Sequence, residues 1–105
     1  MAPLCDMCSE PDPVWVHPAL SFPVNIDGLV LSNSIDEWMA CETCHRLIEA
    51  GDRDALAIRS ADRFMMDHPE FILDYKSVVS QLQQVHDQFF QYRYGESHPV
   101  EVKSL

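Results

Sequence analysis

The cysteines are the residues in this chain whose type and spacing most clearly predict a chemistry. The 105 residues include four cysteines, in the Cys-x-x-Cys pairs Cys5/Cys8 and Cys41/Cys44. Two short loops of this kind can direct four sulfurs at one ion, and Zn²⁺ prefers four thiolates at about 2.3 Å in a tetrahedron. We therefore expect the four cysteines to bind one structural Zn²⁺.

Other uses of the same cysteines explain less of the sequence. In a reducing cytosol, two such pairs favour a metal over disulfides. The stretch from Cys41 to His45 also matches the haem attachment motif of c-type cytochromes, but haem would leave Cys5 and Cys8 without a role. A thioredoxin-like dithiol needs a βαβ context that the pattern does not provide. Four thiolates close the coordination sphere of zinc and leave no position for a reactive water, so we expect no enzyme.

None of the five histidines is needed by a metal that already has four cysteines. His45 directly follows Cys44, which makes joint chelation awkward, and we expect it at the surface or behind the ligands. His86 lies among apolar residues of a predicted helix, where a partly buried histidine is the default. No Ser/His/Asp arrangement and no glycine-rich phosphate loop is recognisable.

The second cysteine pair leads directly into a predicted helix. Leu47 and Ile48 follow Cys44 at the three- and four-residue steps that share a helical face, and Gly51 stands where a glycine ends a helix. Residues 14–16, 22–26 and 29–31 have the composition of short antiparallel strands, with a hairpin turn at 27–28. Residues 32–34 are predicted as a loop, and 35–38 as a turn of helix.

This order of a cysteine knuckle, strands, and a second knuckle that enters a helix resembles a treble-clef zinc finger over residues 5–51. The opening from Cys5 to Trp15 and the block from Trp38 to Leu56 also resemble small bacterial CxxC…CxxCH proteins, which share CxxCSxPDPVW and WxACxxCHxLIEAGDRDAL. The resemblance implies zinc and a shared fold, and it implies no function. A zinc ribbon, with both pairs on hairpins, is the structural alternative.

Two further helices are predicted after Gly51. The first covers 53–66, with Asp52 as its N-cap, and the second covers 69–94, from Pro69 to a stop at Gly95. Apolar residues of the longer helix alternate at steps of three and four, which is a heptad seam. The seam includes Tyr75, Val78, Leu82, Val85 and Phe89. It either packs within the chain or joins two chains in a homodimer.

Together these elements predict a single α+β domain over residues 1–105. It would consist of a small treble-clef-like zinc module (1–51) with short antiparallel strands, two α-helices (52–94) of which the last is long, and a loose tail (95–105). No signal-like region follows Met1, and no apolar run approaches the roughly 20 residues that span a bilayer. We therefore expect a cytoplasmic protein without membrane partners.

The charge distribution indicates the kind of partner. The net charge is −10, and the first basic residue is Arg46. Zinc modules that bind nucleic acid present a basic face to phosphates, so direct nucleic-acid binding is not expected here. An acidic surface suits a basic, nucleic-acid-handling protein, and solubility is the alternative use of the charge. The expected contact residues are Glu10, Asp12, Asp27, Asp36 and Glu37.

Two functional classes follow from these features. The first is a non-enzymatic regulator or inhibitor that binds a basic protein. In size and charge the chain resembles small acidic inhibitors of bacterial defence nucleases, such as anti-CRISPR proteins. The second is a stand-alone zinc-finger factor that acts on nucleic acid or on the transcription machinery.

Overall fold

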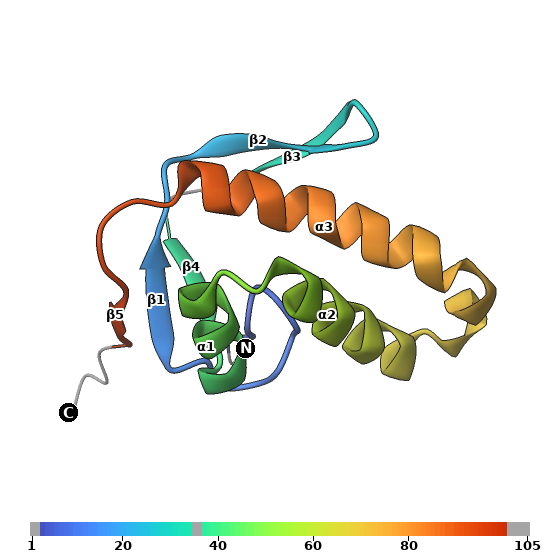
Figure 1. The fold of residues 1–105 in the computed structure, drawn as a ribbon, viewed down its shortest axis with the longest axis horizontal. Helices are drawn as coiled ribbons and strands as arrows, with labels where there is room; N and C mark the ends of the chain where they lie inside the picture. The colour runs from blue at the N-terminus through green and yellow to red at the C-terminus, as the bar shows by residue number, and fades with distance from the viewer. Residues whose placement is uncertain (1–2, 35–36, 101–105) are drawn as a thin grey trace.

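The computed structural model of the chain describes residues 3–34 and 37–100, and it confirms an α+β fold with a long final helical stretch. Figure 1 shows α3 between a β-hairpin on one side and α2 on the other. The elements in order are β1 (Trp15–Pro18), β2 (Phe22–Ile26), β3 (Leu29–Ser34), β4 (Glu37–Ala40), α1 (Glu42–Ala50), α2 (Arg53–Asp67), the 3₁₀ helix η1 (Pro69–Asp74), α3 (Tyr75–Tyr92) and β5 (His98–Pro99). Within these residues, no helix combines the length and apolar character needed to cross a membrane.

The first sheet pairs β1, which follows the first cysteine pair, with β4, which leads into the second. Its order is β4-β1-β5, and both pairings of β1 are antiparallel. The helical turn predicted for 35–38 is wrong where it can be compared: Glu37 and Trp38 belong to β4, and residues 35–36 lie outside the described residues. Pairing with β1 buries the Trp38 ring, and this long-range contact overrides the local preference.

The tail after the last helix also takes part in this sheet. A loose segment was expected from residue 95 onward, yet His98 and Pro99 pair with β1. The amide of Val100 donates to the carbonyl of Val14 at 2.9 Å. The C-terminal segment therefore covers the edge of β1 that β4 leaves free.

The second sheet is the β2–β3 hairpin, and it turns at Asp27-Gly28 as predicted. Both turn residues have positive φ, 51° at Asp27 and 83° at Gly28, which is the geometry that this residue pair favours. Residues 32–34, expected as a loop, are instead the end of β3, because pairing continues until Ser34 lies opposite the buried Phe22. Pro23 is tolerated because β2 pairs with only one strand.

Two glutamines of α3 fasten this hairpin to the helix. The Gln88 amide group accepts from the Asn25 N–H at 2.8 Å and donates to the Asn25 carbonyl at 2.6 Å. Gln84 accepts from the Asp27 N–H at 2.8 Å and donates to the Asp27 carboxylate at 2.9 Å. The side-chain amides thus satisfy the backbone groups that an unpaired strand edge would expose.

Local sequence signals explain where the helices begin and end. Cys41 is the N-cap of α1, and Gly51, with φ of 69°, ends it. Asp52 accepts from the Ala55 N–H at 3.1 Å at the start of α2. The stretch predicted as one helix over 69–94 begins with η1 and continues as α3. It ends at Tyr92, because Arg93 turns extended and forms a bridge with Ala19.

The main core lies where the sheets, α1, α2 and α3 meet. Phe89 is completely buried, and its ring centroid lies 5.0 Å from that of Trp38. Phe22 stacks on Tyr92 with ring centroids 4.9 Å apart, while Leu56 and Ile48 close the core from the helical side. Of the heptad seam, Val85 also packs against this core, whereas Tyr75, Val78 and Leu82 are half-buried. A homodimer through the seam stays a prediction.

A buried histidine on α3 makes stability depend on pH. His86 is 2% exposed, and burial lowers its pKa to about 4, against the opposing effect of neighbouring Asp87. The unfolded chain takes up this proton near pH 6.5, so between pH 6.5 and 4 it holds more protons than the folded chain. We therefore expect His86 to lower the free energy of unfolding as the pH falls through this window, by on the order of 3 kcal/mol at its end.

Urea unfolding at several pH values, compared between the native chain and the His86→Gln variant, checks this expectation. The contribution of His86 to the pH slope of stability, which the variant should lose, is about half a proton at pH 6.5 and close to one proton at pH 5. The comparison of slopes separates His86 from other groups that titrate in both proteins. Equal slopes in the two proteins would show that His86 does not carry the effect.

Candidate metal centre

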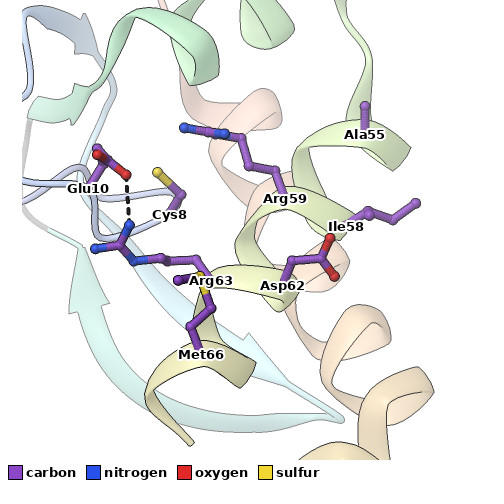
Figure 2. A pocket seen from close by; sticks show the side chains of 8 residues that line it. All are labelled: Cys8, Glu10, Ala55, Ile58, Arg59, Asp62, Arg63 and Met66. Carbon is purple, nitrogen blue, oxygen red and sulfur yellow. Dashed lines mark hydrogen bonds and ion pairs between the residues drawn. The ribbon is translucent and has the colours of Figure 1, made fainter. Parts of the chain in front are cut away.

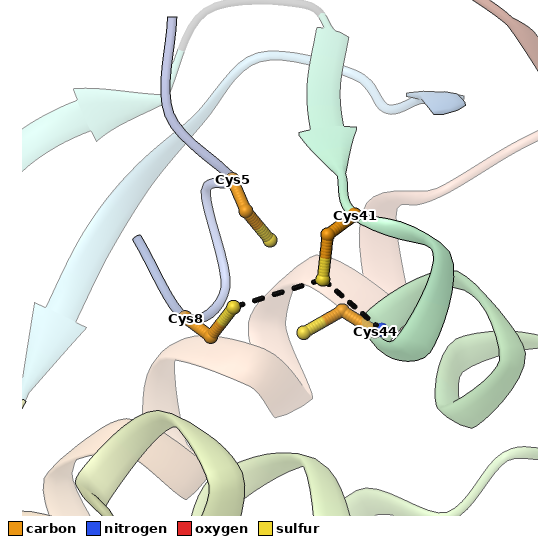
Figure 3. Close-up of side chains that lie close together, drawn as sticks. All are labelled: Cys5, Cys8, Cys41 and Cys44. Atoms are coloured by element: carbon orange, nitrogen blue, oxygen red, sulfur yellow. Dashed lines mark hydrogen bonds between the residues drawn. The ribbon is translucent and has the colours of Figure 1, made fainter. Parts of the chain in front are cut away.

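Four cysteine side chains from separate parts of the chain meet in one buried cluster (Figure 3). Cys5 and Cys8 come from the N-terminal turn, Cys41 follows β4, and Cys44 lies in the first turn of α1. Each cysteine is at most 7% exposed, and their sulfurs all lie within 4.8 Å of one another. The predicted meeting of the two cysteine pairs is therefore confirmed.

The spacing of the sulfurs fits one tetrahedral ion better than a disulfide. Cys8 Sγ and Cys41 Sγ are 3.7 Å apart. Sulfurs at the corners of a tetrahedron with bonds of about 2.3 Å are separated by about 3.8 Å, whereas a disulfide requires about 2.05 Å. All four cysteines are free thiols in the structure. The cluster is thus positioned to bind a metal ion that accepts four sulfur ligands.

Backbone hydrogen bonds hold the N-terminal knuckle against β4. Within the knuckle, Ser9 N–H donates to the Cys5 carbonyl at 2.8 Å. Asp6 links the knuckle to Met39 twice: its N–H donates to the Met39 carbonyl at 2.8 Å, and its carboxylate accepts from the Met39 N–H at 2.7 Å. Burial raises the pKa of Asp6. Sequence reasoning gave Asp6 no role in the site, and its position inside the first Cys-x-x-Cys loop was the available signal.

Positive groups surround the sulfurs on the helical side. The N-terminus of α1 points at the cluster, and the Cys44 N–H donates to Cys41 Sγ at 3.5 Å. Arg59 on α2 donates to the same sulfur, with a distance of 3.7 Å between Nη2 and Sγ. The helix dipole and a guanidinium both favour thiolate over thiol. Arg59 lies 15 positions beyond the last cysteine, and no sequence motif marked it.

The four thiols do not share their protons equally. The pKa of Cys44 is raised by its hydrogen bonds with Cys5 and Cys8 and then by burial, whereas the hydrogen bond with Cys44 lowers the pKa of Cys5. One thiol thus takes the negative charge while a neighbour keeps its proton, as expected of strongly coupled groups. A divalent cation at the centre would stabilise all four thiolates at once.

The acidic residues predicted to contact a partner are spread over several elements. Glu10 forms an ion pair with Arg63 at 2.8 Å, beside a hollow of about 460 Å³ (Figure 2). Asp27 accepts from Gln84 at the tip of the hairpin. Asp12 and Glu37 are exposed, and Asp36 lies outside the described residues. Glu37 shares a hollow of about 350 Å³ with Asp6, which the prediction omitted.

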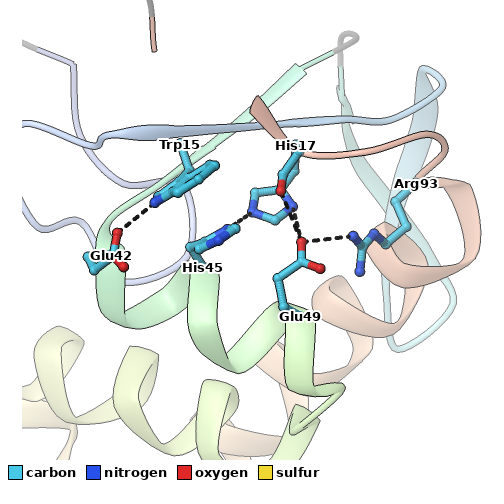
Figure 4. Close-up of polar contacts among 7 residues, drawn as sticks. Trp15, His17, Glu42, His45, Glu49 and Arg93 are labelled. Carbon is cyan, nitrogen blue, oxygen red and sulfur yellow. Dashed lines mark hydrogen bonds and ion pairs between the residues drawn. The ribbon is translucent and has the colours of Figure 1, made fainter. Parts of the chain in front are cut away.

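A second cluster of polar side chains lies on the face of α1 that is turned toward β1 (Figure 4). His17 on β1 approaches His45, with 3.1 Å between His17 Nε2 and His45 Nδ1. Trp15 stacks on His45 with ring centroids 3.8 Å apart, and its indole N–H donates to Glu42 at 2.6 Å. Burial, and then the nearby charge of Arg93, lowers the pKa of His17 to about 4. The sequence reading placed His45 at the surface or behind the ligands and gave His17 no role.

The fold and the thiol cluster define a small α+β protein with a buried four-cysteine metal-binding module. No protein-family description, curated protein or solved structure matches the chain at a significant level.

Proposed function

We propose that the chain is a non-enzymatic regulator, in which one structural Zn²⁺ in a treble-clef-like module supports an acidic surface that binds a basic, nucleic-acid-handling protein. The cluster of four buried thiols is the observation that carries the zinc module. The charge of −10 is the observation that supports the kind of partner.

Zinc is the ion that best suits the ligands and their geometry. Four cysteines supply soft sulfur ligands, and the observed 3.7 Å between Cys8 Sγ and Cys41 Sγ suits Zn–S bonds of about 2.3 Å. The second pair lies at the start of α1, as in a treble clef, whereas a ribbon would place it on a hairpin. Four thiolates give the ion a structural role.

The distribution of charge supports a basic partner over nucleic acid. With Zn²⁺ and four thiolates the net charge becomes about −12. Most arginines of the described chain are paired with carboxylates: Arg46 with Glu42, Arg53 with Asp87, Arg63 with Glu10, and Arg93 with Glu49. These basic groups are neutralised in place, so the surface as a whole repels phosphates and attracts Lys/Arg-lined grooves.

Within the proposed acidic surface, Asp12 and Glu37 are the most available contacts, because both are exposed. Glu10 and Asp27 would have to exchange existing partners within the chain, and Asp36 remains a proposed contact next to Glu37. The metal and the hydrogen bonds between Asp6 and Met39 hold in place the segments that carry Asp12 and Glu37. This limits the conformational entropy that is lost when a partner binds. An inhibitor of a defence nuclease, of the anti-CRISPR type, is one protein of this class.

Affinity capture from the native cell at low and high salt, followed by mass spectrometry, tests this function. We expect a basic nucleic-acid-binding protein that is released by added salt, because exposed charges are screened over about 10 Å at 0.1 M. Glu37→Lys should weaken its binding several-fold without loss of zinc. Asp74→Lys makes the same charge change at the exposed junction of η1 and α3, which carries none of the proposed contacts, and should have a smaller effect.

A nucleic-acid-binding assay on the purified protein separates the proposal from its alternative, a zinc-finger factor that binds nucleic acid directly. That alternative is favoured by Arg59 and Arg63, which line the hollow beside Cys8 (Figure 2). Salt-dependent binding of duplex DNA or RNA by the purified protein, lost in Arg63→Ala, would support the alternative and contradict the acidic-surface proposal. Equal partner affinity of the Glu37→Lys variant and the native chain at low salt would remove Glu37 from the proposed contacts.

A further inference from the structure

The second cluster on α1 has the composition and geometry of a metal site that is separate from the thiols. His45 and Glu49 are four residues apart on α1 and therefore share one face of the helix, and His17 reaches the same face from β1 (Figure 4). One ligand atom from each of the three side chains can be chosen so that all lie within 4.8 Å of one another.

The two imidazoles are close enough for one nitrogen of each to bind a single ion. The 3.1 Å between His17 Nε2 and His45 Nδ1 is near the roughly 3.4 Å that separates two ligands in a tetrahedron with Zn–N bonds of about 2.1 Å. Glu49 lies nearer the other nitrogen of the His17 ring, with 3.9 Å between its Oε1 and His17 Nδ1, so it has to move to bind an ion beside Nε2. The Glu49 side chain is 46% exposed, but its Oε1 already accepts from Arg93 and Ser97, so a bound ion has to replace these contacts.

A buried nitrogen without a partner is the second observation that points to a ligand. His17 is only 1% exposed, and its Nδ1 has no hydrogen-bond partner among the described residues. A buried polar atom without a partner destabilises the fold, and a bound ion or the hydrogen bond of a ligating histidine would remove this cost. The His17 ring therefore has one unpartnered nitrogen, on the side of the ring that faces Glu49.

The surroundings allow an ion to enter and exchange. A cavity of about 420 Å³ opens beside the cluster, and its lining includes Trp15, His45, Glu49 and Arg93. Arg93 at 3.4 Å and Ser97 at 3.1 Å hold Glu49 Oε1. The guanidinium charge opposes a cation at this position, so the site should bind more weakly than four thiolates. Three ligands also leave room for water on the ion.

We propose that His17, His45 and Glu49 bind a second, exchangeable divalent ion of the zinc, cobalt or nickel class. Two imidazoles and a carboxylate are the ligands that such ions accept, and they differ from the soft sulfur set of the thiol cluster. This proposal does not depend on which partner the acidic surface binds.

Titration of the protein already loaded with one equivalent of Zn²⁺ tests the proposal. Isothermal calorimetry with further ZnCl₂ should show one additional equivalent bound. CoCl₂ should give weak visible bands of nitrogen and oxygen ligands, with no sulfur-to-cobalt charge-transfer band, because Zn²⁺ outcompetes Co²⁺ at the thiolates. If no metal binds beyond the first equivalent of zinc, even at millimolar concentration, the proposal is overturned.

Single variants locate the second ion. His45→Ala and Glu49→Gln should each weaken the additional binding at least tenfold while the first zinc stays bound. His68→Ala is the matched control. His68 also lies near a carboxylate, 3.4 Å from Glu70, but this His–Glu pair is not part of the proposed site. If His45→Ala does not fold, Glu49→Gln carries the test. Additional binding that survives both variants would place the ion elsewhere and contradict the proposal.

Discussion

Cys44→Ser is expected to abolish cooperative unfolding of the N-terminal half of the protein near 25 °C. Cys44 is completely buried, and the loss of one sulfur leaves three thiols around an ion that prefers four. Structural zinc contributes about 10–16 kcal/mol of apparent binding energy in zinc-finger peptides, which is comparable to the whole stability of a typical domain, about 5–15 kcal/mol. The Asp6–Met39 hydrogen bonds and the Glu10–Arg63 ion pair also hold the segment before β1, but each contributes far less than the ion, so a strong chelator should have the same effect on the native chain.

Circular dichroism and zinc content measured on the same samples check this expectation. Thr43→Ser is the matched control, because Thr43 is exposed between the two cysteines and its replacement introduces a serine without removing a ligand. The control should keep its zinc and its thermal midpoint. If Cys44→Ser unfolds like the control, within about 1 kcal/mol, the ion does not hold this part of the fold together.

The second large effect is expected from Phe89→Ala, which should lower the free energy of unfolding by about 3–5 kcal/mol. Phe89 is completely buried, and its ring lies 5.0 Å from Trp38 and 6.1 Å from His17. The ring thus contacts both β4 and β1 from α3, and its removal leaves a cavity between the helix and the first sheet. Chemical denaturation followed by tryptophan fluorescence measures the change.

Phe71→Ala is the control for this prediction, since Phe71 is 40% exposed in η1, at the far end of the helical hairpin. We expect it to cost less than 1 kcal/mol. The same experiment bears on the heptad seam, because a dimer held by α3 unfolds at a midpoint that depends on protein concentration. A loss under 1 kcal/mol for Phe89→Ala would contradict the assignment of Phe89 to the centre of the core.

Local signals in the sequence were sufficient for part of the fold and of the site. The two Cys-x-x-Cys pairs predicted the thiol cluster, since each loop by itself sets the direction of two sulfurs. Gly51 predicted the end of α1, and Asp27-Gly28 predicted the hairpin turn, because both depend on backbone angles that only a few residue types favour.

Features that depend on distant partners were not predicted. Trp38 enters a strand because His17, 21 positions earlier, pairs with it. The Gln84 and Gln88 side chains accept hydrogen bonds from backbone N–H groups of a hairpin about 60 positions earlier in the chain. These groups belong to Asp27 and Asn25. Neither residue type marks such a contact, and only the packing of the hairpin on α3 brings the groups together.

The same limit applies to the polar groups around the metal centre. Arg59 reaches Cys41 only because α2 packs beside the knuckles, and the turn between α1 and α2 sets that position. His17 and His45 meet because β1 lies against α1, although no spacing rule connects them. Sequence spacing therefore predicts ligands within a loop, while the residues that tune and surround them depend on the tertiary structure.

X-ray absorption spectroscopy at the zinc edge, on protein loaded with one equivalent of zinc, tests the central claim most directly. The proposed module predicts one tightly bound zinc per chain, with four sulfur neighbours at about 2.3 Å and no nitrogen or oxygen neighbour. Nitrogen or oxygen among the nearest neighbours of this first zinc would contradict the four-cysteine site. A metal-free chain that folds equally well with its cysteines joined in disulfides would contradict it as well.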